Sequence, residues 1–146
     1  MALPASVLFM CSTNSVRSPI AEALMKHFHG HRVFVASAGV RAREIDPFVV
    51  AIMAECGLDL ARHRARTLED LADTSFDLVI TLTPEAHHQA LELTRTLSVE
   101  VEYWPTFDPT VIEGSRETRL EAYRSVRDHL EKRLWERFGR EGGPRV

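Results

Sequence analysis

VLFMCSTNSVRSP, residues 7–19, is the stretch that decides the fold. Its first four residues have the length and apolar character of a buried parallel strand. Ser18-Pro19 supplies a helix cap followed by proline at the first helical position. The residues between must turn from strand to helix, and such a turn directs several backbone N–H groups inward at a helix N-terminus. The stretch therefore predicts a strand, a cradle for a dianion and a helix.

Cys11 leaves the end of this strand and is the candidate nucleophile, because inward amides, the helix end and Arg17 all stabilise a thiolate. The planar fork of Arg17 can hold two phosphoryl oxygens and gains strength as negative charge grows on them in the transition state. Ser18 can cap the helix or donate to the Cys11 sulfur. Asn14 tolerates positive φ and can tie the loop together. The predicted phosphate-binding residues are Ser12, Thr13, Asn14, Ser15, Val16, Arg17 and Ser18.

This spacing resembles the low-molecular-weight protein tyrosine phosphatase family, in which a cysteine, five residues, an arginine and a serine follow the first strand. The similarity covers about residues 5–138, including residues 18–23, 36–39 and 57–66 and the pair Asp108-Pro109. The resemblance implies that Cys11 attacks phosphorus while Asp108 protonates the leaving oxygen, after which the phosphocysteine is hydrolysed. No metal or cofactor is expected, because Arg17 and the loop amides neutralise the phosphoryl charge.

Strand and helix patterns alternate along the chain, which predicts an α/β fold with a four-stranded parallel sheet flanked by helices on both faces, flavodoxin-like, in one domain over residues 1–146. Strands are expected at 7–10, 33–36, 78–81 and 99–103, and helices at 19–29 and 46–56 and from residues 84 and 116. The last helix should turn toward the core Leu120, Tyr123, Val126 or Arg127, Leu130 and Leu134. Asp108 follows the last strand, so it should share the ligand-binding edge of the sheet with Cys11.

The chain departs from the family pattern at three places in and near the predicted site. Thr13 stands where the loop usually has glycine, and Val16 replaces a second loop cysteine common in eukaryotic members. Thr110 and Val111 follow the Asp-Pro pair, where aromatic residues usually wall the phenol slot. The residues therefore favour phosphate-ester hydrolysis more directly than they favour protein phosphotyrosine as the substrate.

Two other functions remain open. Arsenate is isosteric with phosphate, and Tyr123–Asp128 resembles the last helix of arsenate reductases of this fold. The thioredoxin-coupled reductases have a cysteine pair after the third strand, where this chain has Thr81-Leu82-Thr83, and Cys56 stands elsewhere. This leaves a reductase that uses an external thiol. The third reading is a phosphate-binding module without turnover, against which Cys11, Arg17 and Asp108 argue.

Composition agrees with an intracellular enzyme. The chain has 146 residues, 45% of them hydrophobic, and a net charge of -3, which indicates no nucleic-acid partner. Residues 1–10 lack a basic region and contain Pro4, so they predict a strand rather than a secretion signal, and no run suits a membrane span. Two cysteines fit a reducing cytoplasm. The expected partners are a phosphorylated protein or small aryl phosphate, with phosphate, vanadate or arsenate as loop ligands.

The remaining polar residues of interest have simpler interpretations. Cys56 is expected in the core at a helix end. The histidines at 27, 29 and 31 are expected in solvent near a helix terminus, where they favour the helix dipole. His87 and His88 are expected on an exposed helix face. An arginine run is either a solvated face or a positive rim that recruits acidic or phosphorylated partners, and it comprises Arg62, Arg64 and Arg66.

Overall fold

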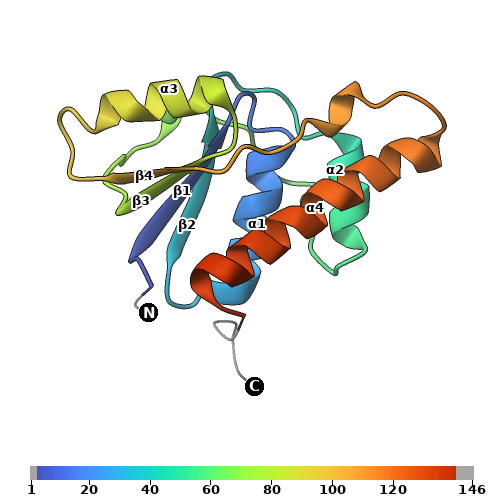
Figure 1. Cartoon of the computed structure of the whole chain (residues 1–146), viewed down its shortest axis with the longest axis horizontal. Coiled ribbons are helices and arrows are strands. Elements are labelled where there is room, and N and C mark those ends of the chain that lie inside the picture. The colour runs from blue at the N-terminus through green and yellow to red at the C-terminus, as the bar shows by residue number, and fades with distance from the viewer. Residues whose placement is uncertain (1–2, 141–146) are drawn as a thin grey trace.

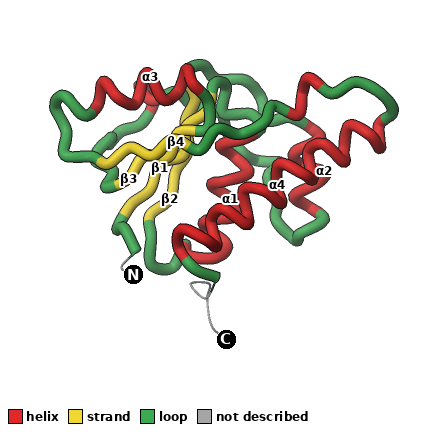
Figure 2. Tube along the Cα trace, in the orientation of Figure 1, coloured by secondary structure: helices red, strands yellow, loops and turns green. Residues whose placement is uncertain are grey.

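A four-stranded parallel sheet in the order β2-β1-β3-β4 forms the centre of the molecule (Figures 1 and 2). The computed structural model describes residues 3–140. The strands are β1 (Ser6–Cys11), β2 (Phe34–Gly39), β3 (Leu78–Thr81) and β4 (Glu100–Tyr103). The helices are α1 (Arg17–His29), α2 (Pro47–Ala54), α3 (Pro84–Leu93) and α4 (Arg116–Phe138), with short 3-10 turns at Leu68–Asp70 and Pro109–Val111. The predicted fold class is confirmed.

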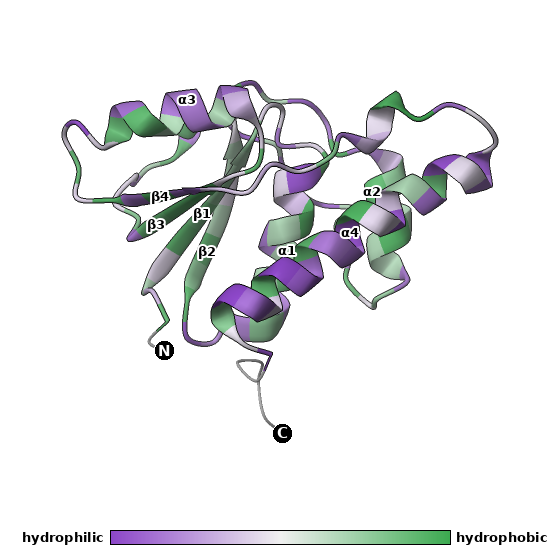
Figure 3. Cartoon of the chain, viewed as in Figure 1, coloured by the Kyte–Doolittle hydropathy of each residue, from purple (hydrophilic) through white to green (hydrophobic). Residues whose placement is uncertain are grey.

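Strand β1 is buried on both faces, which explains its continuous apolar sequence. Successive side chains of a strand point to opposite faces, so Val7 and Phe9 join the core beneath α1, α2 and α4. Leu8 and Met10 join a second core beneath α3, with Ala86 among its members. In Figure 3 the hydrophobic colour runs along the inner strands, whereas the hydrophilic colour marks the outer faces of the helices. The carboxyl end of β1 is thereby fixed between two packed layers.

Most predicted boundaries agree with the structure, and the exceptions are small. Strand β3 and the starts of α3 and α4 fall where the sequence placed them, and Val126 rather than Arg127 is the buried choice on α4. Strand β2 covers residues 34–39 instead of 33–36, β4 begins one residue later and α2 ends two residues earlier. The one-domain prediction includes residues 1–2 and 141–146, which lie outside the described residues, and it stays a prediction. None of the described helices has the length and apolar character that crossing a membrane requires.

Three predictions about the exposure of side chains were wrong. Cys56 is exposed, because α2 ends at Ala54 and the chain turns away at Gly57 with φ of +76°. His29 is buried, because its Nε2 lies 2.9 Å from the Gly139 carbonyl oxygen and its ring packs edge-on against Phe138. His27, His31 and His88 are exposed as expected. His87 is half-buried, because its ring stacks on Tyr103 and its Nδ1 lies 2.9 Å from Thr81 Oγ1.

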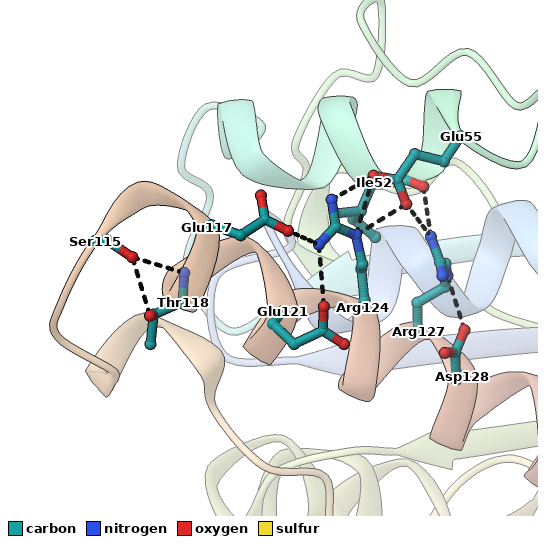
Figure 4. A network of polar contacts seen from close by, with 9 residues as sticks. All are labelled: Ile52, Glu55, Ser115, Glu117, Thr118, Glu121, Arg124, Arg127 and Asp128. Atoms are coloured by element: carbon teal, nitrogen blue, oxygen red, sulfur yellow. Dashed lines mark hydrogen bonds and ion pairs between the residues drawn. The ribbon is translucent and has the colours of Figure 1, made fainter.

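Helix α2 is attached to α4 at both of its ends. At its start, the Tyr123 hydroxyl donates to Asp46 Oδ2 over 2.7 Å, and burial raises the pKa of Tyr123, which keeps it a donor. At its end, the Glu55 carboxylate accepts from Arg124 and Arg127, as Figure 4 shows. These contacts matter for the site because the first residues of α2 line it.

The Glu55 contacts predict an acid-sensitive part of the stability. Hydrogen bonds from Arg124 and then Arg127 lower the pKa of Glu55 to about 2. A carboxyl whose pKa is lower in the folded chain stabilises the fold above its unfolded value of about 4.3, and loses that effect as the pH falls toward 2. Because the pair is solvent-exposed, we expect Glu55→Gln to lower the free energy of unfolding at pH 7 by less than about 1 kcal/mol.

Denaturant unfolding at pH 7, 4 and 3 measures this difference, which should shrink as the pH falls. The exposed Glu136→Gln serves as a charge-matched control with no such trend. A difference that stays constant from pH 7 to 3 would show that the Glu55 charge is not the cause.

Candidate active site

The loop between β1 and α1 turns its carbonyl groups outward. Four of them accept hydrogen bonds from backbone N–H groups of the segment after β2. Val40 donates to the Cys11 carbonyl over 3.1 Å and Arg41 to that of Ser12 over 2.8 Å. Arg43 donates to the Thr13 carbonyl over 3.0 Å and Asp46 to that of Ser15 over 3.1 Å. Within residues 3–140, the backbone N–H groups of residues 12–16 make no hydrogen bond to the protein. A peptide whose carbonyl points outward directs its N–H to the opposite side, so these amides are free to bind an anion.

Asn14 holds the loop in shape from a fully buried position. Its φ of +54° is the left-handed conformation that the sequence suggested for asparagine. Its Nδ2 donates to Ser18 Oγ at 2.8 Å and Ser37 Oγ at 2.9 Å. Its Oδ1 accepts from the Arg66 backbone N–H at 3.0 Å and lies 3.1 Å from His63 Nε2. Burial lowers the pKa of His63, which favours the neutral ring in this network.

Close packing of the loop against β2 requires a glycine. A Cβ at Gly39 would lie 2.7 Å from the Asn14 backbone nitrogen and 2.4 Å from the Arg41 carbonyl oxygen. Both neighbours are backbone atoms, so neither could move without distorting the loop. Thr13, in contrast, accommodates its side chain, whose Oγ1 lies 2.7 Å from Ser15 Oγ. The substitution of the usual loop glycine by Thr13 is therefore compatible with the fold.

The Cys11 sulfur lies at the bottom of the loop and is almost fully buried. Ser18 contacts it twice: Ser18 Oγ lies 2.9 Å from Cys11 Sγ, and the Ser18 N–H donates to the sulfur over 3.4 Å. A thiolate only accepts hydrogen bonds, so both Ser18 groups donate to it when it is ionised. Of the two roles predicted for Ser18, the helix cap was wrong, because α1 begins at Arg17 after an uncapped Val16. Its hydroxyl serves the sulfur instead.

Arg17 and Asp108 line the same cavity of about 660 Å³ as Cys11. Arg17 Nη1 donates to the Thr106 carbonyl oxygen over 3.0 Å, which anchors one edge of the guanidinium. Asp108 Oδ1 accepts from the Thr110 N–H at 3.0 Å and from Thr110 Oγ1 at 2.7 Å. The sheet edge thus brings together the three residues that the sequence proposed as catalytic.

The aromatic wall of this cavity comes from a residue that the sequence reasoning missed. Phe48, on the first turn of α2, lines the cavity, whereas the exposed Val111 does not. The guanidinium carbons of Arg119 and Arg116 lie 4.5 and 5.3 Å from the Phe48 ring centre. The available signal was the Asp46-Pro47 helix start soon after β2, because a helix that begins near the carboxyl edge of a parallel sheet faces the ligand.

The arginine run lies away from this cavity. Arg62, Arg64 and Arg66 line a separate hollow of about 430 Å³ that also includes Lys26 and Glu22. The hollow is connected to the loop through Asn14, whose partners His63 and Arg66 line it. The described residues contain no cluster of three or more His, Cys, Asp or Glu side chains arranged to hold a metal ion.

We expect Arg17→Lys to reduce both phosphate affinity and turnover, by about 10²-fold or more in kcat/KM, because a lysine cannot make the bidentate contact to two phosphoryl oxygens. Steady-state kinetics on an aryl phosphate and titration with inorganic phosphate measure the two effects. Arg32→Lys, at an exposed position before β2, is the matched control. Unchanged constants in the Arg17 variant would place its guanidinium outside the anion site.

The family of the chain follows from its sequence once this geometry is known. A sequence model described as "Low molecular weight phosphotyrosine protein phosphatase" matches residues 6–139, which include the loop, Asp108 and nearly all of the described chain. The chain belongs to this family. The resemblance inferred from the loop and the Asp-Pro pair is thus confirmed.

Relatives of this family member include both reductases and phosphatases. An arsenate reductase of Halalkalibacterium halodurans is 34% identical over 88% of this chain and 91% of its own length. A solved structure of the YwlE arginine phosphatase, a mutant with a phosphorylated active-site serine, is 29% identical, covers 88% of this chain and 90% of that chain, and has a TM-score of 0.70. An arsenate reductase in a phosphate-binding state is 26% identical over 93% of this chain and 98% of that chain, also with a TM-score of 0.70.

Proposed function

We propose that this family member hydrolyses phosphate monoesters through a phosphocysteine intermediate. One observation carries the proposal: Cys11, whose sulfur Ser18 contacts twice, lines one cavity together with Asp108 and with loop residues whose backbone amides have no partner within residues 3–140. A cysteine in a phosphate cradle opposite a carboxyl group has the nucleophile, the electrophile binding site and the proton donor that this reaction needs.

In the first step, Cys11 Sγ attacks phosphorus and the ester P–O bond breaks. The leaving oxygen takes a proton from the carboxyl group of Asp108, while Arg17 and the loop amides bind the three equatorial oxygens. In the second step, water attacks phosphorus and gives its proton to the Asp108 carboxylate. The S–P bond breaks, inorganic phosphate leaves and Cys11 returns as a thiolate accepting from Ser18.

We further propose protein phosphotyrosine as the substrate class. The family description names phosphotyrosine, and Phe48 supplies an aromatic wall beside the anion cradle. The arginine phosphatase among the neighbours makes phosphoarginine the first alternative side chain to test. Both esters and phosphoramidates place the phosphoryl group in the same cradle, so the walls of the cavity decide between them.

Arsenate reduction with an external thiol is the second candidate, and it is favoured by the arsenate reductases among the relatives. In that reaction the Cys11 sulfur displaces water from arsenate and forms an S–As bond. An external thiol then attacks the Cys11 sulfur, the electron pair of the S–As bond stays on arsenic, and arsenite leaves. A second external thiol reduces the mixed disulfide that remains and restores Cys11. Cys56 is not placed to serve as the internal thiol. It is exposed beyond the end of α2 and lies outside the lining of the cavity that contains the buried Cys11.

One experiment separates the two candidates. Purified protein is assayed for release of phosphate from phosphotyrosyl peptide, phosphoarginyl peptide and an aryl phosphate, and in parallel for arsenite formation with glutathione, glutaredoxin or thioredoxin supplied. We expect phosphate release from the tyrosyl peptide and the aryl phosphate, abolished by vanadate. Arsenite formation without any phosphate release would overturn the proposed function in favour of the second candidate.

A further inference from the structure

The mouth of the catalytic cavity carries more positive charge than the chain as a whole. Among the described residues, five arginines and three carboxylates line the cavity, although the chain has a net charge of -3. We define the arginine rim as Arg43, Arg116 and Arg119. Arg43 comes from the segment after β2, and Arg116 and Arg119 come from the first turn of α4, where both lie over the Phe48 ring.

The rim arginines are not used for ion pairs within the protein. Within residues 3–140, no carboxylate lies within 4 Å of the guanidinium of any of the three. Arg41, which also lines the mouth, differs, because both of its terminal nitrogens donate to Glu85. The rim therefore keeps its charge available to whatever enters the cavity.

Two of the three carboxylates in the cavity lining accept hydrogen bonds within the protein. The Asp46 carboxylate accepts from the Phe48 N–H at 2.8 Å and from the Tyr123 hydroxyl. The Asp108 carboxylate accepts from Thr110. Glu44 is the remaining carboxylate in the lining and is exposed. These hydrogen bonds come from neutral donors and leave both carboxylates charged, but the five arginines of the lining still outnumber its three carboxylates, so the entrance has an excess of positive charge that favours an anionic substrate.

The position of two rim arginines is unfavourable for the helix that carries them. Arg116 is the first residue of α4 and Arg119 lies on its first turn, where the helix dipole is positive and disfavours cations. Their stacking on Phe48 fixes the guanidinium groups beside the aromatic wall. These two arginines destabilise the start of α4 and lie at the entrance of an anion site, and their position is explained if they bind the substrate.

We infer that the substrate is a phosphoprotein segment with Asp or Glu next to the phosphorylated residue, recognised by the arginine rim. The inference rests on the proposed function and narrows its substrate class. The cavity of about 660 Å³ extends well beyond the phosphate loop, so it has room for flanking side chains. Arg43, Arg116 and Arg119 line this cavity together with Phe48, and each can pair with a carboxylate of the bound segment.

The test compares two phosphotyrosyl peptides that differ in four flanking residues, which are Glu in one and Gln in the other. At low salt we expect kcat/KM to be about 10-fold or more higher for the Glu peptide, and the ratio to fall to about 2-fold or less at 0.5 M salt. Arg43→Glu and Arg119→Glu should each reduce the ratio severalfold. The charge-matched control Arg32→Glu, at an exposed position before β2, should leave the ratio unchanged.

Arg116→Glu distinguishes a role of Arg116 in substrate binding from a role in stability. It should raise the thermal midpoint, because an acidic side chain suits the start of α4, and yet reduce the preference for the Glu peptide. Binding of both peptides to Cys11→Ser, which does not depend on turnover, should show the same preference. Equal binding and equal kcat/KM for the two peptides would overturn the rim inference alone. Absence of turnover with both peptides, beside retained preference in binding, would overturn the proposed function but not the rim.

Discussion

Cys11→Ser should lose phosphate-ester turnover by at least about 10⁴-fold while it still binds inorganic phosphate with an affinity close to that of the unaltered protein. The reason is that the groups that bind phosphate are separate from the sulfur that attacks it. The loop amides are positioned by outward carbonyls and by Asn14, neither of which involves the sulfur. Phosphate release from an aryl phosphate and calorimetric titration with phosphate measure the two properties.

Cys56→Ser is the matched control, because it makes the same change at the exposed second cysteine. It should retain full phosphate-ester turnover, and in the arsenate assay it should also behave like the unaltered protein. Turnover by Cys11→Ser well above the uncatalysed rate would show that another group attacks phosphorus. A large loss in Cys56→Ser would instead point to a role of that thiol that its position on the surface does not explain.

The parts of the site that could be predicted from the sequence are those formed by neighbouring residues. The strand, turn and helix of residues 7–29 lie in one continuous segment, so apolar pattern and turn chemistry were enough to place Cys11 and Arg17. Asp108 required one further rule, that loops after parallel strands meet at one edge. The positive φ of Asn14 followed from its residue type alone.

The parts that could not be predicted depend on contacts between distant segments. The partners Ser37, His63 and Arg66 lie 23, 49 and 52 residues from Asn14, and no local pattern marks them. The burial of His29 comes from a contact with the chain 110 residues further on. The role of Ser18 was left between two possibilities, because a two-residue shift in the start of α1, from the predicted residue 19 to Arg17, decides whether its hydroxyl caps the helix or contacts the sulfur.

Substrate recognition was the least predictable property. Thr110 and Val111 provide no aromatic side chain after the Asp-Pro pair, and the aromatic residue in the cavity lining is Phe48, from another element. The rim likewise joins Arg43 to the start of α4, more than seventy residues away in sequence, through a shared cavity. A chain can therefore keep the catalytic loop of its family while it rebuilds the surface that selects substrates, since the two depend on different segments.

The second large effect concerns Asp108, and it separates a general acid from a residue that only shapes a turn. Protonation of the leaving oxygen matters most when that oxygen is basic, as in a phenolate whose conjugate acid has a pKa of about 10. We expect Asp108→Asn to cut kcat by about 10²- to 10⁴-fold on phenyl or tyrosyl phosphate, and distinctly less on the ester of an acidic phenol. The fold should survive, because an asparagine Oδ1 can still accept from Thr110.

The measurement is a series of aryl phosphates plotted against the pKa of the leaving phenol, which should be nearly flat for the unaltered protein and steep for Asp108→Asn. Asp73→Asn is the matched control: Asp73 Oδ1 accepts from the Ser75 N–H over 2.9 Å, the same turn contact that Asp108 makes with Thr110, and Asp73 is outside the cavity lining. Its plot should remain flat. Equal slopes for Asp108→Asn and the unaltered protein would mean that Asp108 only holds the turn. The acid would then have to be another group at this edge of the sheet, because the leaving oxygen departs in the direction opposite to the Cys11 sulfur.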